Sequence, residues 1–166
     1  MMPESELPRE AVVGFWRGRS LLSRVIRWQT RSPYSHVGWR CPDGTVIEAW
    51  AGMGVRHVAN ASIAHTPGTE IDWFDLDGLT ESARDRLEGF LVGQLGLRYD
   101  YRSVFRFLTR GNRQDNRKAW FCSELIAAAM CAAGLPPLSP RVENWQISPA
   151  LLSMSPRLFL IGRIQG

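Results

Sequence analysis

The residue with the clearest capacity for covalent chemistry is Cys122, which lies at the start of a helical pattern over residues 121–133. A thiol in the first turn of a helix faces the positive end of the helix dipole, which stabilises the thiolate. The backbone N–H groups of that turn are also suited to hold the oxyanion of a tetrahedral intermediate. Cys122 is therefore the candidate nucleophile, whereas Cys41 and Cys131 are expected to pack as small buried hydrophobes.

A cysteine nucleophile needs a base, and the sequence contains three histidines, His36, His57 and His65. His36 is distinguished by its setting, because it lies in a predicted strand that runs from Tyr34 to Arg40. We therefore assign His36 as the general base.

The turn after this strand fixes which residues face His36. Pro42-Asp43-Gly44 has the residue types of a tight turn and separates the strand predicted at 34–40 from a second one at 45–50. A type I turn followed by a glycine bulge would pair Cys41 with Thr45.

In that register His36 and Glu48 are diagonal neighbours on one face of the hairpin, roughly 7 Å apart at the backbone. A plain two-residue turn would place them on opposite faces, so their pairing depends on Gly44 forming the bulge. Glu48 would accept the imidazole N–H and fix the tautomer, as the third member of a catalytic triad does. The sequence thus predicts a triad of Cys122, His36 and Glu48.

The rest of the chain predicts an α+β fold, with strands in the middle and helices towards both ends. In the first helix, Leu21, Leu22, Val25 and Ile26 are assigned to an apolar face and Arg24, Arg27 and Arg31 to the other. One domain is expected over residues 1–166, with residues 1–10 as a flexible tail. Further strands are predicted at 11–17, 54–58, 70–76 and 158–164, and helices at 20–29, 81–95, 101–110, 121–133 and 148–154.

Composition limits the location and the chemistry. Hydrophobic residues make up 45% of the 166 residues and charged residues 22%, which is typical of a folded globular protein. No apolar run reaches membrane-spanning length, the first residues lack a signal-peptide core, and three cysteines cannot form a disulfide framework. We expect a cytoplasmic protein, with export by another route left open. No metal ligand set and no cofactor-binding motif is predicted.

Positive charge is concentrated in residues 98–118, which contain seven of the 20 basic side chains and only two acidic ones. Arg98, Arg102, Arg106 and Arg110 repeat every four residues, and the last three of them lie in the helix predicted at 101–110. Guanidinium groups bind phosphates and carboxylates bidentately, so this stripe is a candidate contact for an anionic polymer or a membrane surface. An inert, solvated surface is the alternative.

Four short motifs now stand in a fixed order: Tyr34-Ser35-His36-Val37-Gly38, Val46-Ile47-Glu48-Ala49, Tyr99-Asp100 and Phe121-Cys122-Ser123-Glu124-Leu125. Together they resemble the circularly permuted NlpC/P60 (papain-like) cysteine hydrolases of the YiiX/YaeF-like group, over roughly residues 11–149. The resemblance implies a papain-like core in which an antiparallel sheet packs against the helix bearing the cysteine. It also implies Cys122 as nucleophile, His36 as general base and Glu48 as orienter. The residues expected to bind substrate are Tyr34, Ser35, Trp50, Trp120 and Ser123.

The function implied by this resemblance is cleavage of an amide bond through a thioester intermediate, by a cysteine amidase or peptidase. Peptides, peptidoglycan peptides and lipid-linked amides are the expected substrate classes. A lipid-directed acyltransferase or thioesterase on the same triad is one alternative. A catalytically silent module that binds through the arginine-rich segment 98–118 is another.

Overall fold

The structure is a computed structural model that describes residues 6–63, 65–101 and 119–165. In chain order its elements are β1 (Val13–Trp16), α1 (Leu21–Thr30), β2 (His36–Arg40), β3 (Val46–Trp50), β4 (Gly54–Val58), β5 (Glu70–Leu76), α2 (Glu81–Gly93), β6 (Arg98–Tyr99), β7 (Ala119–Trp120), α4 (Cys122–Ala132), the 3₁₀ turn η2 (Asn144–Gln146), α5 (Pro149–Leu152) and β8 (Leu158–Gln165).

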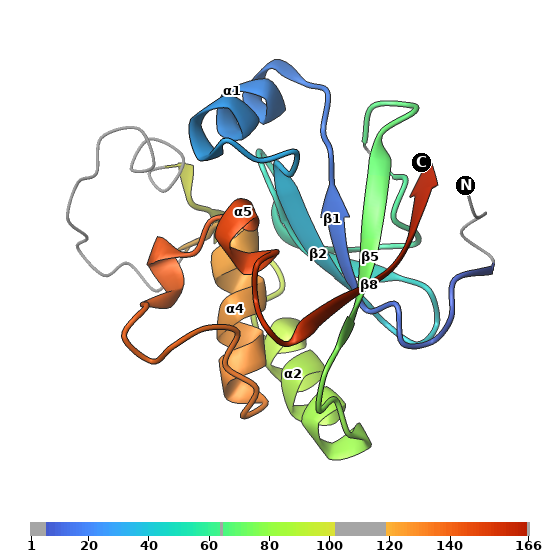
Figure 1. Cartoon of the computed structure of the whole chain (residues 1–166), viewed down its shortest axis with the longest axis vertical. Coiled ribbons are helices and arrows are strands. Elements are labelled where there is room, and N and C mark those ends of the chain that lie inside the picture. Colours follow the sequence, from blue (N-terminus) through green and yellow to red (C-terminus); the bar gives the residue numbers. More distant parts are fainter. Residues whose placement is uncertain (1–5, 64, 102–118, 166) are drawn as a thin grey trace.

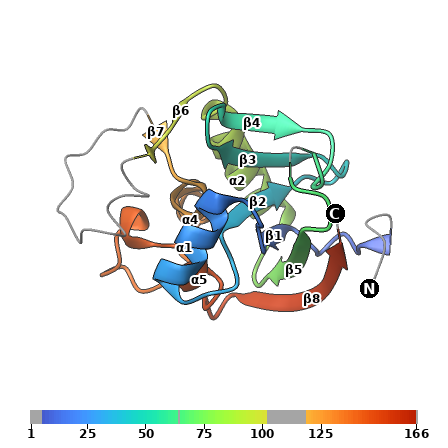
Figure 2. The same cartoon turned by 90° about the horizontal axis from the view of Figure 1, so that it is seen from above.

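Six of the strands form one antiparallel sheet in the order β4-β3-β2-β1-β5-β8. α4 packs against β2 and β3, and α2 packs against α4 (Figure 1). Strands β6 and β7 form a separate parallel pair beside the start of α4 (Figure 2). This architecture confirms the predicted α+β class and the packing of an antiparallel sheet against the helix that bears the cysteine.

Both faces of the central strands are buried, which explains their nearly continuous apolar sequences. One face packs with α2 and α4 in the larger core, which includes Phe15, Val37, Trp39, Leu87 and Leu125. The other face forms a second, smaller core, which includes Trp16, Val46, Ile71, Trp73 and Ile164. Leu7 is buried in this second core as well, so the packed chain begins inside the tail predicted at 1–10.

The hairpin has the predicted register. Trp39 pairs with Ile47, and the Cys41 N–H donates to the Thr45 carbonyl at 2.8 Å. Gly44 adopts a φ of 87°, the left-handed conformation that the bulge requires. His36 and Glu48 consequently project from the same face of the sheet.

α4 is buried along nearly its whole length, from Cys122 to Met130. Its run of alanines and short apolar residues allows close packing on several sides. The expectation that Cys131 packs in the core is wrong, because Cys131 lies just past this buried stretch and is exposed. Cys41 is buried, as expected.

The predicted apolar face of α1 is also wrong. Only Ile26 is buried in this helix, whereas Leu21 and Leu22 are exposed. At 100° per residue, Ile26 lies about 140° around the helix from Leu21, so both side chains cannot face one core. The sequence pattern could not decide which of them faced inward.

Parts of two predictions lie outside the described residues. Arg98 is exposed in β6, but the helix predicted at 101–110 is described only at Tyr101, and the rest of the basic segment, residues 102–118, lies outside the described residues. Arg102, Arg106 and Arg110 therefore have no described placement. Across residues 6–63, 65–101 and 119–165, none of the helices combines the length and the hydropathy that crossing a bilayer requires.

The bulge gives a test of the hairpin. A Cβ at Gly44 would meet no atom within 4 Å, so Gly44→Ala changes only backbone energy, and we expect it to lower the free energy of unfolding by about 1–2 kcal/mol. Gly89 in α2 also faces open space, but its backbone is helical, so Gly89→Ala should instead raise stability by about 0.5–1 kcal/mol. Urea unfolding of the two variants measures both changes in the free energy of unfolding. A Gly44→Ala protein that is as stable as the parent or more stable would contradict the bulge.

Candidate active site

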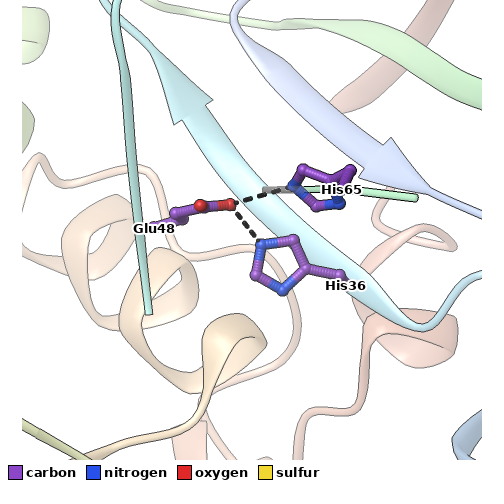
Figure 3. Close-up of side chains that lie close together, drawn as sticks. All are labelled: His36, Glu48 and His65. Carbon is purple, nitrogen blue, oxygen red and sulfur yellow. Dashed lines mark hydrogen bonds and ion pairs between the residues drawn. The ribbon is translucent and has the colours of Figure 1, made fainter. Parts of the chain in front are cut away.

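Glu48 lies at the centre of the candidate site, with only 1% of its surface exposed. Its Oε2 accepts a hydrogen bond of 2.6 Å from His36 Nε2 (Figure 3). Its Oε1 accepts two more, from Arg56 Nε at 2.9 Å and Arg56 Nη2 at 2.5 Å. Arg56 stands directly opposite Glu48 in the pairing of β3 with β4, so the sheet register itself brings guanidinium and carboxylate together.

His36 hydrogen-bonds to Glu48, and Cys122 influences its pKa as well. Burial alone would lower the pKa of His36, because it disfavours the charged imidazolium. The Glu48 carboxylate and a hydrogen bond with Cys122 outweigh this effect and raise the pKa of His36 from 6.5 to about 9. Burial would likewise raise the pKa of Glu48, but the charge and hydrogen bond of His36 hold it below its usual range. The pair is therefore an imidazolium and a carboxylate at neutral pH.

Cys122 is the first residue of α4 and is 1% exposed. The N-cap of α4 is Phe121, whose side chain makes no capping hydrogen bond. In contrast, hydroxyl side chains accept from first-turn N–H groups at the starts of three other helices: Ser20 at α1, Thr80 at α2 and Ser148 at α5. The first turn of α4 thus has an apolar cap next to the thiol.

His65 was missed as a site residue by the sequence analysis, which weighed it only as an alternative base. Its ring stacks on Trp16 at 5.0 Å and contacts Trp50 at 4.6 Å. Its Nε2 lies 3.5 Å from Glu48 Oε2 but is buried without a hydrogen-bond partner among the described residues. Burial lowers the pKa of His65, and the charge of His36 adds to this effect, so the second imidazole is neutral where the first is charged.

Trp16 positions both histidines from β1. Its indole contacts His36 edge-on at 5.2 Å, and its Nε1 donates to the Ala61 carbonyl at 3.0 Å. A Cβ at Gly38 would approach Trp16 to 3.2 Å, and one at Gly14 to 2.9 Å. The glycine in the Tyr34-Ser35-His36-Val37-Gly38 motif is therefore explained by the room that this indole needs.

Most of the predicted substrate-binding side chains are engaged within the fold. The Tyr34 hydroxyl donates to Asp72 at 2.7 Å, the Ser123 hydroxyl donates to the Ile147 carbonyl at 2.5 Å, and Ser35 Oγ accepts from the Gly18 N–H at 3.0 Å. Trp50 contacts the triad, with its ring centroid 5.3 Å from that of His36. Trp120 lies two residues before Cys122, and its Nε1 donates to Gln94 at 3.1 Å. Substrate binding by these five residues stays a prediction.

One set of described residues also has the composition of a metal site, which the sequence analysis did not predict. The ligand atoms of His36, Glu48 and His65 all lie within 4.8 Å of one another. Two imidazoles and a carboxylate are a common ligand set for Zn²⁺, and the unpartnered Nε2 of His65 fits such a role.

Comparison with known proteins identifies the fold. No protein-family model matches the sequence, and a search of curated proteins gave no match. Among solved structures, the chain is similar to the metalloprotein yiiX from Escherichia coli O157:H7, with a TM-score of 0.69. The chain has the yiiX fold. The likeness covers 95% of this chain and 98% of that one at 18% sequence identity, so it extends over the sheet and the helices alike.

The two histidines should titrate in opposite directions. We expect His36 to stay protonated until the pH approaches 9, and His65 to become neutral below the ordinary value of 6.5. Since the pKa of His36 is raised on folding, its stabilising contribution is complete below pH 6.5 and is lost as the pH rises through about 9. Nitrogen-15 NMR titration of the imidazoles checks this assignment, and His36→Gln and His65→Gln identify the signals. A neutral His36 at pH 7 would contradict it.

Proposed function

We propose that this protein is a cysteine hydrolase that cleaves an amide bond through a triad of Cys122, His36 and Glu48. The observation that carries the proposal is the position of His36, whose Nε2 hydrogen-bonds to Glu48 and whose pKa is raised by Cys122 as well as by that carboxylate. A nucleophile, a base and an orienter connected in that order are the geometric signature of covalent acyl transfer.

The reaction follows from the protonation state of this group. With Nε2 bonded to Glu48, the other ring nitrogen of the His36 imidazolium carries the proton that the Cys122 thiol has given up, so the cysteine enters the reaction as a thiolate. The thiolate attacks the substrate carbonyl, and N–H groups in the first turn of α4 stabilise the oxyanion. The His36 imidazolium then protonates the leaving amine as the thioester forms. Neutral His36 next removes a proton from water, whose attack on the thioester releases the carboxylic acid and restores the Cys122 thiolate beside the His36 imidazolium.

Glu48 and Arg56 support this cycle without touching the substrate. The carboxylate stabilises the imidazolium in each half-reaction and keeps Nε2 occupied. The two bonds from Arg56 to the other carboxylate oxygen hold Glu48 in place. We infer that Arg56 is a positioning residue for the triad.

The fold and the motif order support a circularly permuted NlpC/P60-type enzyme of the YiiX/YaeF-like group. We propose peptidoglycan peptides as the first substrate class and lipid-linked amides as the second. Acyl transfer to an amine or alcohol, or thioester hydrolysis, would use the same thioester chemistry.

The substrate class is tested by incubating the purified protein with peptidoglycan and, separately, with phospholipid, followed by mass spectrometry of the products. Cys122→Ala should abolish product formation, because it removes the proposed nucleophile, the thiol that raises the pKa of His36. Cys131→Ser is the matched control, since it removes an exposed thiol and should leave product formation unchanged. Products that persist in Cys122→Ala would refute the proposal.

A second candidate function is a divalent metal site formed by His36, Glu48 and His65. The buried Nε2 of His65, which lies 3.5 Å from Glu48 Oε2 without a hydrogen bond among the described residues, favours it, and the similar structure is described as that of a metalloprotein. Bound Zn²⁺ would supply a Lewis acid and a water of lowered pKa. The two functions compete for the same atoms, because His36 and Glu48 would have to exchange their mutual hydrogen bond for the ion.

Calorimetric titration with Zn²⁺ separates these candidates. If the three residues form a metal site, His65→Gln should weaken zinc binding about 10-fold or more, while Cys122→Ala should leave it unchanged. Equal zinc binding by the parent protein and His65→Gln would exclude a metal at this cluster.

A further inference from the structure

The outer face of α1 carries an unusual amount of exposed apolar surface. Leu21 and Trp28 are each 77% exposed, and Leu22 is 37% exposed. Leu21, Val25 and Trp28 recur at the spacing of one helix face, so they form a single ridge. Ile26, on the inward side, is the residue through which the helix is anchored in the core.

Positive charge borders this ridge. Arg24 and Arg31 are exposed, and together with Arg27 and Trp28 they surround an open hollow of about 460 Å³ whose rim is completed by Ser32 and Pro33. The ten residues of α1 contain no acidic side chain. Within the described part of the chain, Arg24 and Arg31 form no ion pair. The hollow therefore presents guanidinium groups next to an indole ring.

The position of α1 relates this face to the candidate active site. α1 connects β1 to β2, and the Gly18 N–H just before it donates to Ser35, the residue next to His36. In Figure 1, α1 lies at the same end of the molecule as the start of α4. A surface bound to α1 would thus lie beside the end of the fold that carries the triad.

We propose that α1 docks this protein onto the surface of an anionic phospholipid bilayer. Lipid phosphates enter the hollow and pair with Arg24, Arg27 and Arg31, while Trp28 and Leu21 insert into the boundary between headgroups and acyl chains. Basic residues beside an aromatic and aliphatic ridge are the pattern of helices that lie in the membrane interface. A nucleic acid would use the arginines but would leave Leu21 and Val25 exposed to water, so the observations favour a lipid surface.

Vesicle flotation measures membrane binding and not catalysis. A negative result would therefore overturn the docking proposal without bearing on the proposed hydrolase activity. The parent protein should float with phosphatidylcholine vesicles that contain phosphatidylglycerol, weakly with pure phosphatidylcholine, and less as salt rises. The double variant Arg24→Gln with Arg31→Asn should lower the partition coefficient about 30-fold. Trp28→Gln should weaken binding at every salt concentration, and Cys122→Ala should bind as the parent does.

The matched control is Arg9→Gln with Arg141→Gln, which removes the same charge from exposed positions outside α1. It should retain binding, and circular dichroism should show all variants folded. The proposal is overturned if the control loses as much binding as the α1 variant, if neutral and anionic vesicles bind equally, or if no vesicle binds at low salt. It is equally overturned if a single-stranded oligonucleotide binds more tightly than the vesicles and Trp28→Gln has no effect.

Discussion

The buried carboxylate of Glu48 is the constraint on which the site depends. An ionised group at 1% exposure is stable only where charges and hydrogen bonds compensate for lost hydration, and His36 and Arg56 provide both. Asp72, equally buried, offers a contrast, because Arg17, Arg163 and Tyr34 satisfy it and none of these is a nucleophile or a base at neutral pH. The same physical requirement thus yields a structural network at Asp72 and a candidate triad at Glu48.

The sheet satisfies this requirement through register. β2 presents His36 and β4 presents Arg56 to the carboxylate on β3. Trp16, on β1, packs edge-on against His36, and the glycines at positions 14 and 38 leave room for its indole. Each partner comes from a neighbouring strand, so the group is held by backbone pairing and not by long flexible loops. His65 is the exception, since it comes from the segment between β4 and β5 and is held mainly by aromatic contacts.

The parts of this site that could be predicted are those set by local chemistry. Pro42-Asp43-Gly44 determines the hairpin register, and the register determines that His36 faces Glu48. Arg56 was within reach of the same reasoning, because β4 was predicted correctly and only its pairing with β3 was not worked out. His65 had no such signal, since its stacking on Trp16 joins residues 49 positions apart. The outward face of α1 and the exposure of Cys131 were missed because periodicity shows that a helix has faces but not which of them the rest of the fold covers.

The central claim, that Glu48 and His36 activate Cys122, is tested most directly by alkylation with iodoacetamide in a Cys131→Ser background. Mass spectrometry locates the label and so distinguishes Cys122 from Cys41, the other remaining thiol. The claim predicts that Cys122 reacts readily at pH 7, and that His36→Ala and Glu48→Gln each slow the reaction at that pH. A rate at pH 7 that is the same in the parent protein and in both variants would contradict it.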